Sequence, residues 1–152
     1  IWGYGYKKIY SKRTLNYYKN IFFAQKNPVI KAYKKEVWGL EMYSILQKSV
    51  VTFNVHEALL NGNVGNMRMF EATGVATMIL NDYGHNLSKL FEIGKEIECY
   101  NTIDEAVEKV NYYTQHPDKA IEIGINAQKK TLTNYNYDIY TETILTHLKK
   151  LL

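Results

Sequence analysis

The sequence predicts an α/β fold in which a Rossmann-like parallel sheet carries helices on both faces and ends in helices at the C-terminus. Two short apolar segments rich in β-branched residues, 50–55 and 75–80, have the composition of strands buried on both faces. Helix-like segments alternate with them, which is typical of parallel sheets. Ligands in such folds bind beyond the carboxyl ends of the strands. We therefore expect a site in segments 54–66 and 81–86.

The remaining elements follow from local patterns. Residues 1–8 indicate the end of a strand and a turn with two glycines, and residues 96–100 alternate like a third strand. Apolar residues at helical spacing, together with caps and breakers, predict the helices. In chain order they are 11–19, 38–47, about 67–73, 87–93, one that opens at Thr102, 117 to about 132, and 137–152.

The last three helices have the clearest start signals. Thr102 followed by Glu105 forms a capping box, and Pro117 occupies a favoured first position. We expect the first of these helices to bury Ile103, Val107, Val110 and Tyr113. We expect the last one to be amphipathic, with Tyr140, Ile144, Leu148 and Leu151 along one face. The tyrosines Tyr135, Tyr137 and Tyr140 are expected to pack against helices.

Length and composition indicate one globular domain over residues 1–152. With 152 residues and 14% aromatic side chains, the chain can bury a sizeable core and is not of the disordered class. No apolar run approaches the ~18 residues that a membrane span needs. Because the sequence begins at Ile1 without an initiator methionine, we expect it to be the C-terminal part of a longer two-domain protein.

The charge is unevenly distributed. Residues 1–49, which we call the basic half, hold ten Lys/Arg against two Glu, whereas the rest of the chain is net acidic. Such a half is typical of a solvated surface, a contact with a missing domain or an anionic membrane, or nucleic-acid binding. No nucleic-acid motif accompanies it, so we expect no nucleic-acid partner.

The single cysteine and the histidines favour no redox or metal chemistry. Cys99 is alone, which excludes an internal disulfide and a cysteine-based zinc site, and we expect a small buried side chain in a reducing, cytoplasmic compartment. His56, Asp82 and His85 have no metal-ligand spacing, so no metal site is expected.

A loop followed by a helix carries the features of an anion site. Asn63, Gly65 and Asn66 precede the predicted helix, where glycine lets backbone amides approach a phosphate and the helix N-terminus supplies free N–H donors. Arg68 has a guanidinium suited to phosphate oxygens. Glu71 lies on about the same helix face, where its carboxylate can accept two hydrogen bonds from a ribose diol. A surface ion pair between Arg68 and Glu71 is the alternative interpretation.

Other polar residues lie at the same edge of the predicted sheet. His56 follows a buried strand, where it either binds phosphate or sugar or is satisfied by the loop. Asn54, Asp82 and His85 are weaker candidates, because ordinary turn chemistry also explains them.

From about Trp38 onward the chain resembles the C-terminal domain of CgeB-like glycosyltransferases, a GT-B-fold group related to the family-4 glycosyltransferases. Trp2–Gly5 is also similar to the strand and glycine turn that open that domain. The matching stretches, in order, are Glu41–Ser49, Val51–His56, Asn66–Gly74, Leu90-Phe91, Gly94–Glu96, Tyr112-Tyr113 and His116-Pro117. The sequence departs from the group at Thr133-Asn134-Tyr135, where relatives often have His-Thr-Tyr.

The resemblance implies a domain that binds a nucleotide-diphosphate sugar as donor substrate, with no permanently bound cofactor. Glu71 matches the glutamate that contacts the ribose. Asn63 stands where relatives have the glutamate near the donor sugar, and Arg68 is the candidate for neutralising pyrophosphate. The implied enzyme is a hexosyltransferase-like glycosyltransferase of cytoplasmic glycan biosynthesis, with a peripheral contact at the inner face of the membrane.

The catalytic residues are expected in the missing N-terminal domain, so the isolated domain would be inactive or weakly active. The alternative is a non-catalytic Rossmann-like module that binds a partner or an anionic surface through the basic half.

Overall fold

The computed structural model describes residues 32–56 and 61–151. The chain divides into two units, Ile1–Met42 and Tyr43–Leu152. Most of the first unit lies outside the described residues, as do the expected turn in 1–8, the expected helix 11–19 and the resemblance at Trp2–Gly5. The expected single domain over 1–152 therefore stays a prediction.

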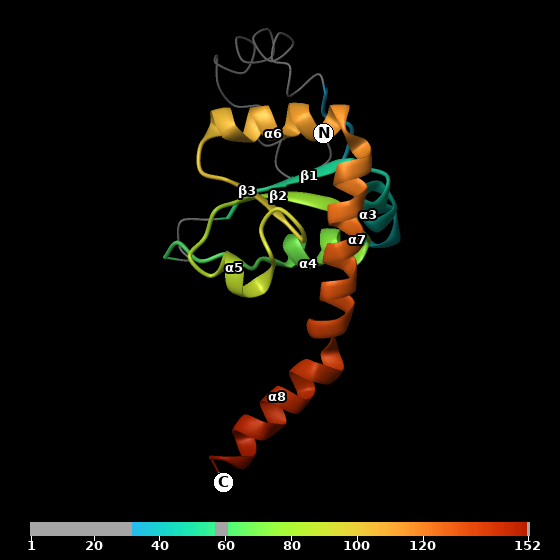
Figure 1. The fold of residues 1–152 in the computed structure, drawn as a ribbon. Coiled ribbons are helices and arrows are strands. Elements are labelled where there is room, and N and C mark those ends of the chain that lie inside the picture. The colour runs from blue at the N-terminus through green and yellow to red at the C-terminus, as the bar shows by residue number, and fades with distance from the viewer. Residues whose placement is uncertain (1–31, 57–60, 152) are drawn as a thin grey trace, which may run out of the picture. The chain divides into compact units, whose positions relative to one another are not determined.

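The second unit carries the sheet and nearly all of the described helices. Its strands are short, and its three longest helices come at the C-terminal end of the chain (Figure 1). In chain order the elements are α3 (Gly39–Gln47), β1 (Val51–Asn54), α4 (Met67–Gly74), β2 (Met78–Asp82), α5 (Leu87–Leu90), β3 (Glu98–Tyr100), α6 (Ile103–Gln115), α7 (Pro117–Asn134) and α8 (Tyr137–Lys149).

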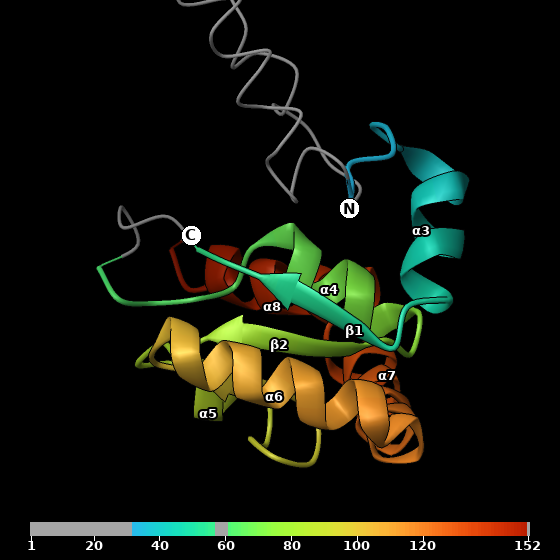
Figure 2. The ribbon, with the colours of Figure 1, turned by 90° about the horizontal axis from the view of Figure 1, so that it is seen from above.

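The three described strands form one parallel sheet in the order β1-β2-β3. Helix α6 contacts all three strands, whereas α4 contacts β1 and β2. Figures 1 and 2 show these two helices on opposite faces of the sheet. The predicted α/β class, with a parallel sheet between helices, is confirmed.

Helix α7 packs against β2 and approaches the backbone at its amino end. A Cβ atom added to Gly124 of α7 would lie only 2.2 Å from the carbonyl oxygen of Ala76, just before β2. This contact requires glycine at position 124. The core beside it is built from β2, β3, α6 and α7, and consists of Met78, Leu80, Tyr100, Ala106, Tyr113, Ala120 and Ile123.

Several element boundaries differ from the sequence-based expectation. The strand predicted over 75–80 begins only at Met78, because α4 continues to Gly74 and the chain then turns through Ala76 at φ 62°. The helix predicted over 87–93 ends at Leu90, because Phe91 adopts an extended backbone and is fully buried.

The predicted buried faces of α6 and α8 are partly wrong. In α6, Ile103 and Val107 are 80% and 55% exposed, whereas Ala106 and Tyr113 face the core. A small alanine at the contact lets the helix approach the sheet closely, and this places its neighbours outside. Helix α8 buries no residue of its predicted apolar face.

The caps at the helix starts follow the sequence. Thr102 Oγ1 accepts a hydrogen bond from the Glu105 amide at 3.2 Å, and Pro117 is the first residue of α7. The return contact of the capping box is shifted by one residue, since the Glu105 carboxylate accepts from the Asn101 amide at 2.8 Å. Within the described part of the chain, no helix is both long and apolar enough to cross a bilayer.

Candidate functional site

The carboxyl ends of β1 and β2 bring the two candidate loops together. Asn54, the last residue of β1, is the register partner of Asn81 in β2. The loop 61–66 leads into α4, and the turn 83–86 leads into α5. The expectation that both segments meet at one edge of the sheet is confirmed by this register.

Several short contacts fasten the two loops to each other. The side chain of Asn86 accepts a hydrogen bond from the Val64 amide and donates one to the Val64 carbonyl, each at 2.8 Å. The His85 amide donates to the Gly62 carbonyl at 2.9 Å. A Cβ atom added to Gly84 would lie 2.5 Å from Val64 Cγ1, so glycine is required for this close approach. The loop before α4 is therefore held in one conformation.

A network of asparagine side chains supports the loop from the sheet. Asn54 Nδ2 donates to Asn66 Oδ1 at 3.0 Å and to Asn81 Oδ1 at 2.7 Å, while Asn66 Nδ2 donates back to Asn54 Oδ1 at 3.1 Å. Asn66 also caps α4, because its Oδ1 accepts from the Met69 amide at 3.1 Å. Asn54 and Asn81 are buried, so these bonds satisfy amides that have little access to water.

Tyr100 lies beneath this network. Its hydroxyl donates to the Asn54 carbonyl at 3.0 Å. Burial raises the pKa of Tyr100 to about 12, and the nearby Asp82 carboxylate acts in the same direction. The side chain is therefore a neutral phenol that positions the end of β1.

His56 is bonded on every polar atom of its ring. Its Nδ1 lies 2.7 Å from Asp82 Oδ1, and its own amide donates to Asp82 Oδ2 at 3.0 Å. Its Nε2 accepts from the amides of Gly65 at 3.0 Å and Asn66 at 3.1 Å. Since Nε2 accepts two N–H bonds, the proton is on Nδ1 and the ring is neutral.

This arrangement changes the expected anion site. The Gly65 and Asn66 amides, which the sequence assigns to a phosphate, are occupied by the His56 imidazole, whose side chain is only 3% exposed. Gly65 has a φ of 138°, which residues with a side chain rarely adopt, and this backbone aims its amide at the imidazole. Of the two roles considered for His56, the structure shows the one in which the loop satisfies it.

The first turn of α4 retains unused donors. Among the described residues, the amides of Met67 and Arg68 have no hydrogen-bond partner, as is usual for the start of a helix. The Arg68 guanidinium is partly exposed beside them and pairs with Glu71, with Nη1 3.2 Å from Oε2. The alternative interpretation of Arg68 and Glu71 as an ion pair is thus observed.

Glu71 borders a cavity of about 560 Å³ that runs along α4. Its side chain is 18% exposed, so the carboxylate is neither buried nor free in solvent. Aromatic and aliphatic side chains form most of the wall. The lining residues are Tyr43, Met67, Phe70, Glu71, Gly74, Val75, Thr131, Leu132, Tyr135, Tyr137 and Tyr140, and Arg68 is not among them.

The tyrosines of this cavity differ in their packing. Tyr135 packs against Phe70 and Phe91 and donates its hydroxyl to the Leu90 carbonyl at 2.7 Å, as expected for a structural residue. Tyr137 and Tyr140 are 90% and 49% exposed, so their predicted helix packing is wrong. Their rings are accessible to a ligand in the cavity.

The other sequence candidates lie apart from this arrangement or support it. Asn63 is exposed in the loop. Asp82 serves as the hydrogen-bond partner of His56, and the His85 side chain is exposed next to Tyr83. In the described ranges, no group of three or more metal-ligating side chains comes together.

Cys99 is buried, as predicted. Its burial raises the pKa of the thiol, which disfavours the reactive thiolate.

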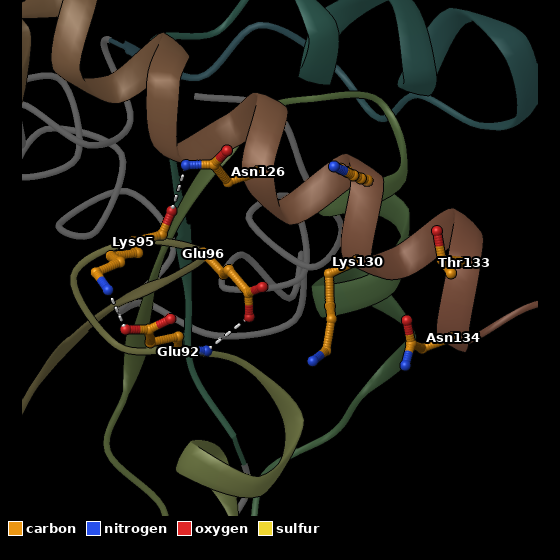
Figure 3. A pocket seen from close by; sticks show the side chains of 8 residues that line it. Glu92, Lys95, Glu96, Asn126, Lys130, Thr133 and Asn134 are labelled. Carbon is orange, nitrogen blue, oxygen red and sulfur yellow. Dashed lines mark hydrogen bonds and ion pairs between the residues drawn. The ribbon is translucent and has the colours of Figure 1, made fainter.

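A second, polar cavity lies at the amino end of β3. It has a volume of about 350 Å³ and lies between the segment before β3 and the helix α7 (Figure 3). Within it, Lys95 Nζ pairs with Glu92 Oε1 at 2.6 Å, and Glu96 Oε2 accepts from the Glu92 amide at 2.8 Å. Asn126 of α7 donates to the Lys95 carbonyl at 3.2 Å. This cavity is at the sheet edge where ligands of such folds do not usually bind.

The sequence identified most of these residues but not the hydrogen bonds between them. Asn81 and Asn86 were not singled out, although an asparagine at the end of each neighbouring strand was a usable signal. The cavity beside Glu71 was not predicted, because its wall comes from three segments that lie far apart in the sequence, namely Tyr43, 67–75 and 131–140.

Comparison with known proteins identifies the family. The model of a family described as "Glycosyl transferase-like" matches residues 1–146, which is nearly the whole chain. No curated protein matches the sequence. The parallel sheet and its helices fit half of a GT-B fold. The chain therefore belongs to the glycosyl transferase-like family.

Proposed function

We propose that this chain is the donor-binding domain of a glycosyltransferase and that it binds a nucleotide-diphosphate sugar at the N-terminus of α4. The observation that carries this proposal is the juxtaposition of free amides at Met67 and Arg68 with the Glu71 carboxylate one turn further along. The helix dipole and the Arg68 guanidinium attract the diphosphate. The site differs from the sequence-based one because the phosphate uses the helix amides rather than those of Gly65 and Asn66.

The nucleoside would lie along α4 from this point. Met67 is at the N-terminus of the helix and also lines the cavity that contains Glu71, so the two features are continuous. Glu71 would accept hydrogen bonds from the ribose diol, and Arg68 would exchange its bond to Glu71 for one to phosphate. Aromatic walls such as Tyr140 suit the flat face of a base.

These contacts would assist transfer by stabilising the nucleotide diphosphate as it leaves the anomeric carbon. Among the described residues at the site, His56 is engaged by the protein on both ring nitrogens, and Asp82 is engaged by His56. A base that activates the acceptor would therefore come from an N-terminal domain. The isolated domain would bind donor weakly and turn over little.

Several finer assignments belong to the same proposal. They are the CgeB-like subgroup, hexosyl transfer, a role in cytoplasmic glycan biosynthesis, and a peripheral membrane contact. The alternative is a binding module that uses the basic half. Seven of the ten Lys/Arg residues of that half lie in residues 1–31, outside the described ranges. No observation favours that alternative.

Isothermal titration of the chain with UDP, GDP and ADP tests the proposal. We expect at least one nucleoside diphosphate to bind, and the matching nucleoside without phosphate to bind at least tenfold more weakly, since it lacks the charge that the helix end and Arg68 recognise. Arg68→Ala should reduce binding of the diphosphate, whereas Lys89→Ala, on exposed α5, is the control. Absence of binding by all three diphosphates would reject the proposal.

A further inference from the structure

We propose that neutral His56 is a positioning residue that holds the loop 61–66 in the conformation required for diphosphate binding. The effect on diphosphate binding rests on the proposed function. The hydrogen bonds of His56 to Asp82 and to the loop are observed independently of any ligand. A single imidazole connects the segment after β1, the end of β2 and the loop before α4. No other described side chain bonds to all three.

The hydrogen bond at one ring nitrogen of His56 determines the role of the other ring nitrogen. The Asp82 carboxylate accepts from Nδ1 and from the backbone amide of the same residue, which fixes both the ring orientation and the tautomer. Nε2 is then obliged to be an acceptor, and it receives two consecutive amides, those of Gly65 and Asn66. The imidazole thus occupies the place that a phosphate oxygen takes in loops of this kind.

The backbone amides at the N-terminus of α4 therefore fall into two sets. The Gly65 and Asn66 amides point at His56 inside the protein, whereas the Met67 and Arg68 amides remain for a ligand. If the imidazole were lost, the exposed Gly65 amide and the half-buried Asn66 amide would lose their shared acceptor, and the loop would lose its link to the ends of β1 and β2. Because Asn66 is the N-cap of α4, a change in the loop would also change the geometry of the Met67 and Arg68 amides.

The protonation state of His56 decides whether the arrangement holds. A second proton on Nε2 would remove the acceptor and direct an N–H group at two other N–H groups. The charged or titratable groups nearby are Asp82 of β2, the Arg68–Glu71 pair of α4, His85 of the turn 83–86 and Tyr100 of β3. Of these, only Asp82 bonds to the imidazole among the described residues. Asp82 therefore holds the imidazole in the Nδ1–H tautomer, which leaves Nε2 as the acceptor for the loop.

Two substitutions separate the roles of the two ring nitrogens. In His56→Gln, the side-chain oxygen can take the place of Nε2 and accept from the loop amides. In His56→Asn, the shorter amide can replace Nδ1 and contact Asp82, but it does not reach the loop. His116→Asn is the control, because the exposed His116 ring, between α6 and α7, bonds to the Tyr112 carbonyl and stacks on the Tyr112 ring.

Amide hydrogen exchange of the full chain by NMR measures the loop directly. We expect exchange at Gly65 and Asn66 to accelerate by about tenfold or more in His56→Asn and to stay within about threefold of wild type in His56→Gln, as for loss or retention of a hydrogen bond. Equal protection in wild type and His56→Asn would overturn the inference. If His56→Asn does not fold, ¹⁵N NMR of the wild-type imidazole decides, since the inference requires the Nδ1–H tautomer and an Nε2–H tautomer would refute it.

Titration with UDP, GDP and ADP then tests the link to binding. We expect His56→Asn to bind about tenfold more weakly than wild type, and His56→Gln to bind nearly as well. Unchanged affinity in His56→Asn would overturn the positioning role. Failure of the wild type to bind any diphosphate would instead reject the proposed function, and the exchange experiment would still decide on the loop.

Discussion

At the residue scale, the proposed function depends most on Glu71. It lines a cavity with aromatic walls and lies one helical turn from unused amide donors. Its pairing with Arg68 is partly exposed, so that ion pair adds little to stability and is free to exchange for a ligand. Under the proposed function, these two residues act in recognition of the ligand.

Glu71→Gln tests this interpretation. The substitution keeps the size of the side chain but removes the charge and one of two acceptor oxygens for the ribose diol. We expect the affinity for a bound nucleoside diphosphate to fall by about tenfold, as for loss of a hydrogen bond to a charged group. Calorimetric titration gives the value, with Glu108→Gln on the exposed side of α6 as the matched control. Equal affinities for wild type and Glu71→Gln would remove Glu71 from the site.

At the element scale, α7 packs against β2 and crosses close to its amino end. Gly124 permits the crossing, because α7 approaches the backbone at Ala76 and Met78. Thr131 of the same helix donates to Thr73 of α4 at 2.7 Å, and Gln128 donates to the Gly74 carbonyl at 3.0 Å. Helix α7 therefore anchors both β2 and the helix that carries the site.

Gly124→Ala should destabilise the chain. The new methyl group would meet a backbone carbonyl that cannot move aside, and overpacking of this kind typically costs about 1–3 kcal/mol. Urea unfolding followed by circular dichroism measures the change. Gly74→Ala is the control, since its added Cβ would lie 3.9 Å from the nearest atom, and we expect it to be neutral or stabilising by up to ~1 kcal/mol. Similar stability of both variants would show that the α7 crossing is not tight.

The start of α6 offers a smaller, local test. Thr102→Ala removes the oxygen that accepts from the Glu105 amide, and loss of such a cap costs about 1 kcal/mol. Thermal unfolding should show a lower midpoint for this variant, and Thr102→Ser, which retains the hydroxyl, should behave like wild type. A midpoint unaffected by Thr102→Ala would mean that the cap does not contribute to stability.

At the scale of the whole molecule, the sequence predicted the order and type of elements better than their contacts. Alternating strands and helices, the Thr102 cap and Pro117 at the start of α7 are local signals, and all of them hold. The bonds between His56, Asp82 and Gly65 are not local, because they exist only once β1 and β2 lie side by side. For the same reason, helical spacing did not identify which apolar residues of α6 reach the sheet.

Alkaline pH should weaken the folded state through two buried tyrosines. Burial raises the pKa of Tyr100 and that of Tyr113 to about 12, with the Glu98 carboxylate adding to the effect at Tyr113. An unfolded tyrosine ionises near pH 10. The stabilisation is therefore complete below about pH 10 and is lost as pH rises toward about 12, because the unfolded chain releases its protons first.

Urea unfolding between pH 9 and pH 12 checks this expectation. Tyr113→Phe should show a shallower loss of stability with rising pH than wild type. Tyr137→Phe, at a position that is 90% exposed, should leave the slope unchanged. The same slope in Tyr113→Phe and wild type would contradict the role assigned to burial.

The central claim is that a nucleoside diphosphate binds at the N-terminus of α4 rather than in the lysine-lined cavity at the amino end of β3. Mapping of ¹H-¹⁵N chemical shifts during titration with the diphosphate that binds most tightly distinguishes the two directly. We expect the largest changes at the amides of Met67, Arg68 and Glu71. Changes centred on Lys129 and Lys130, with the α4 amides unmoved, would contradict it.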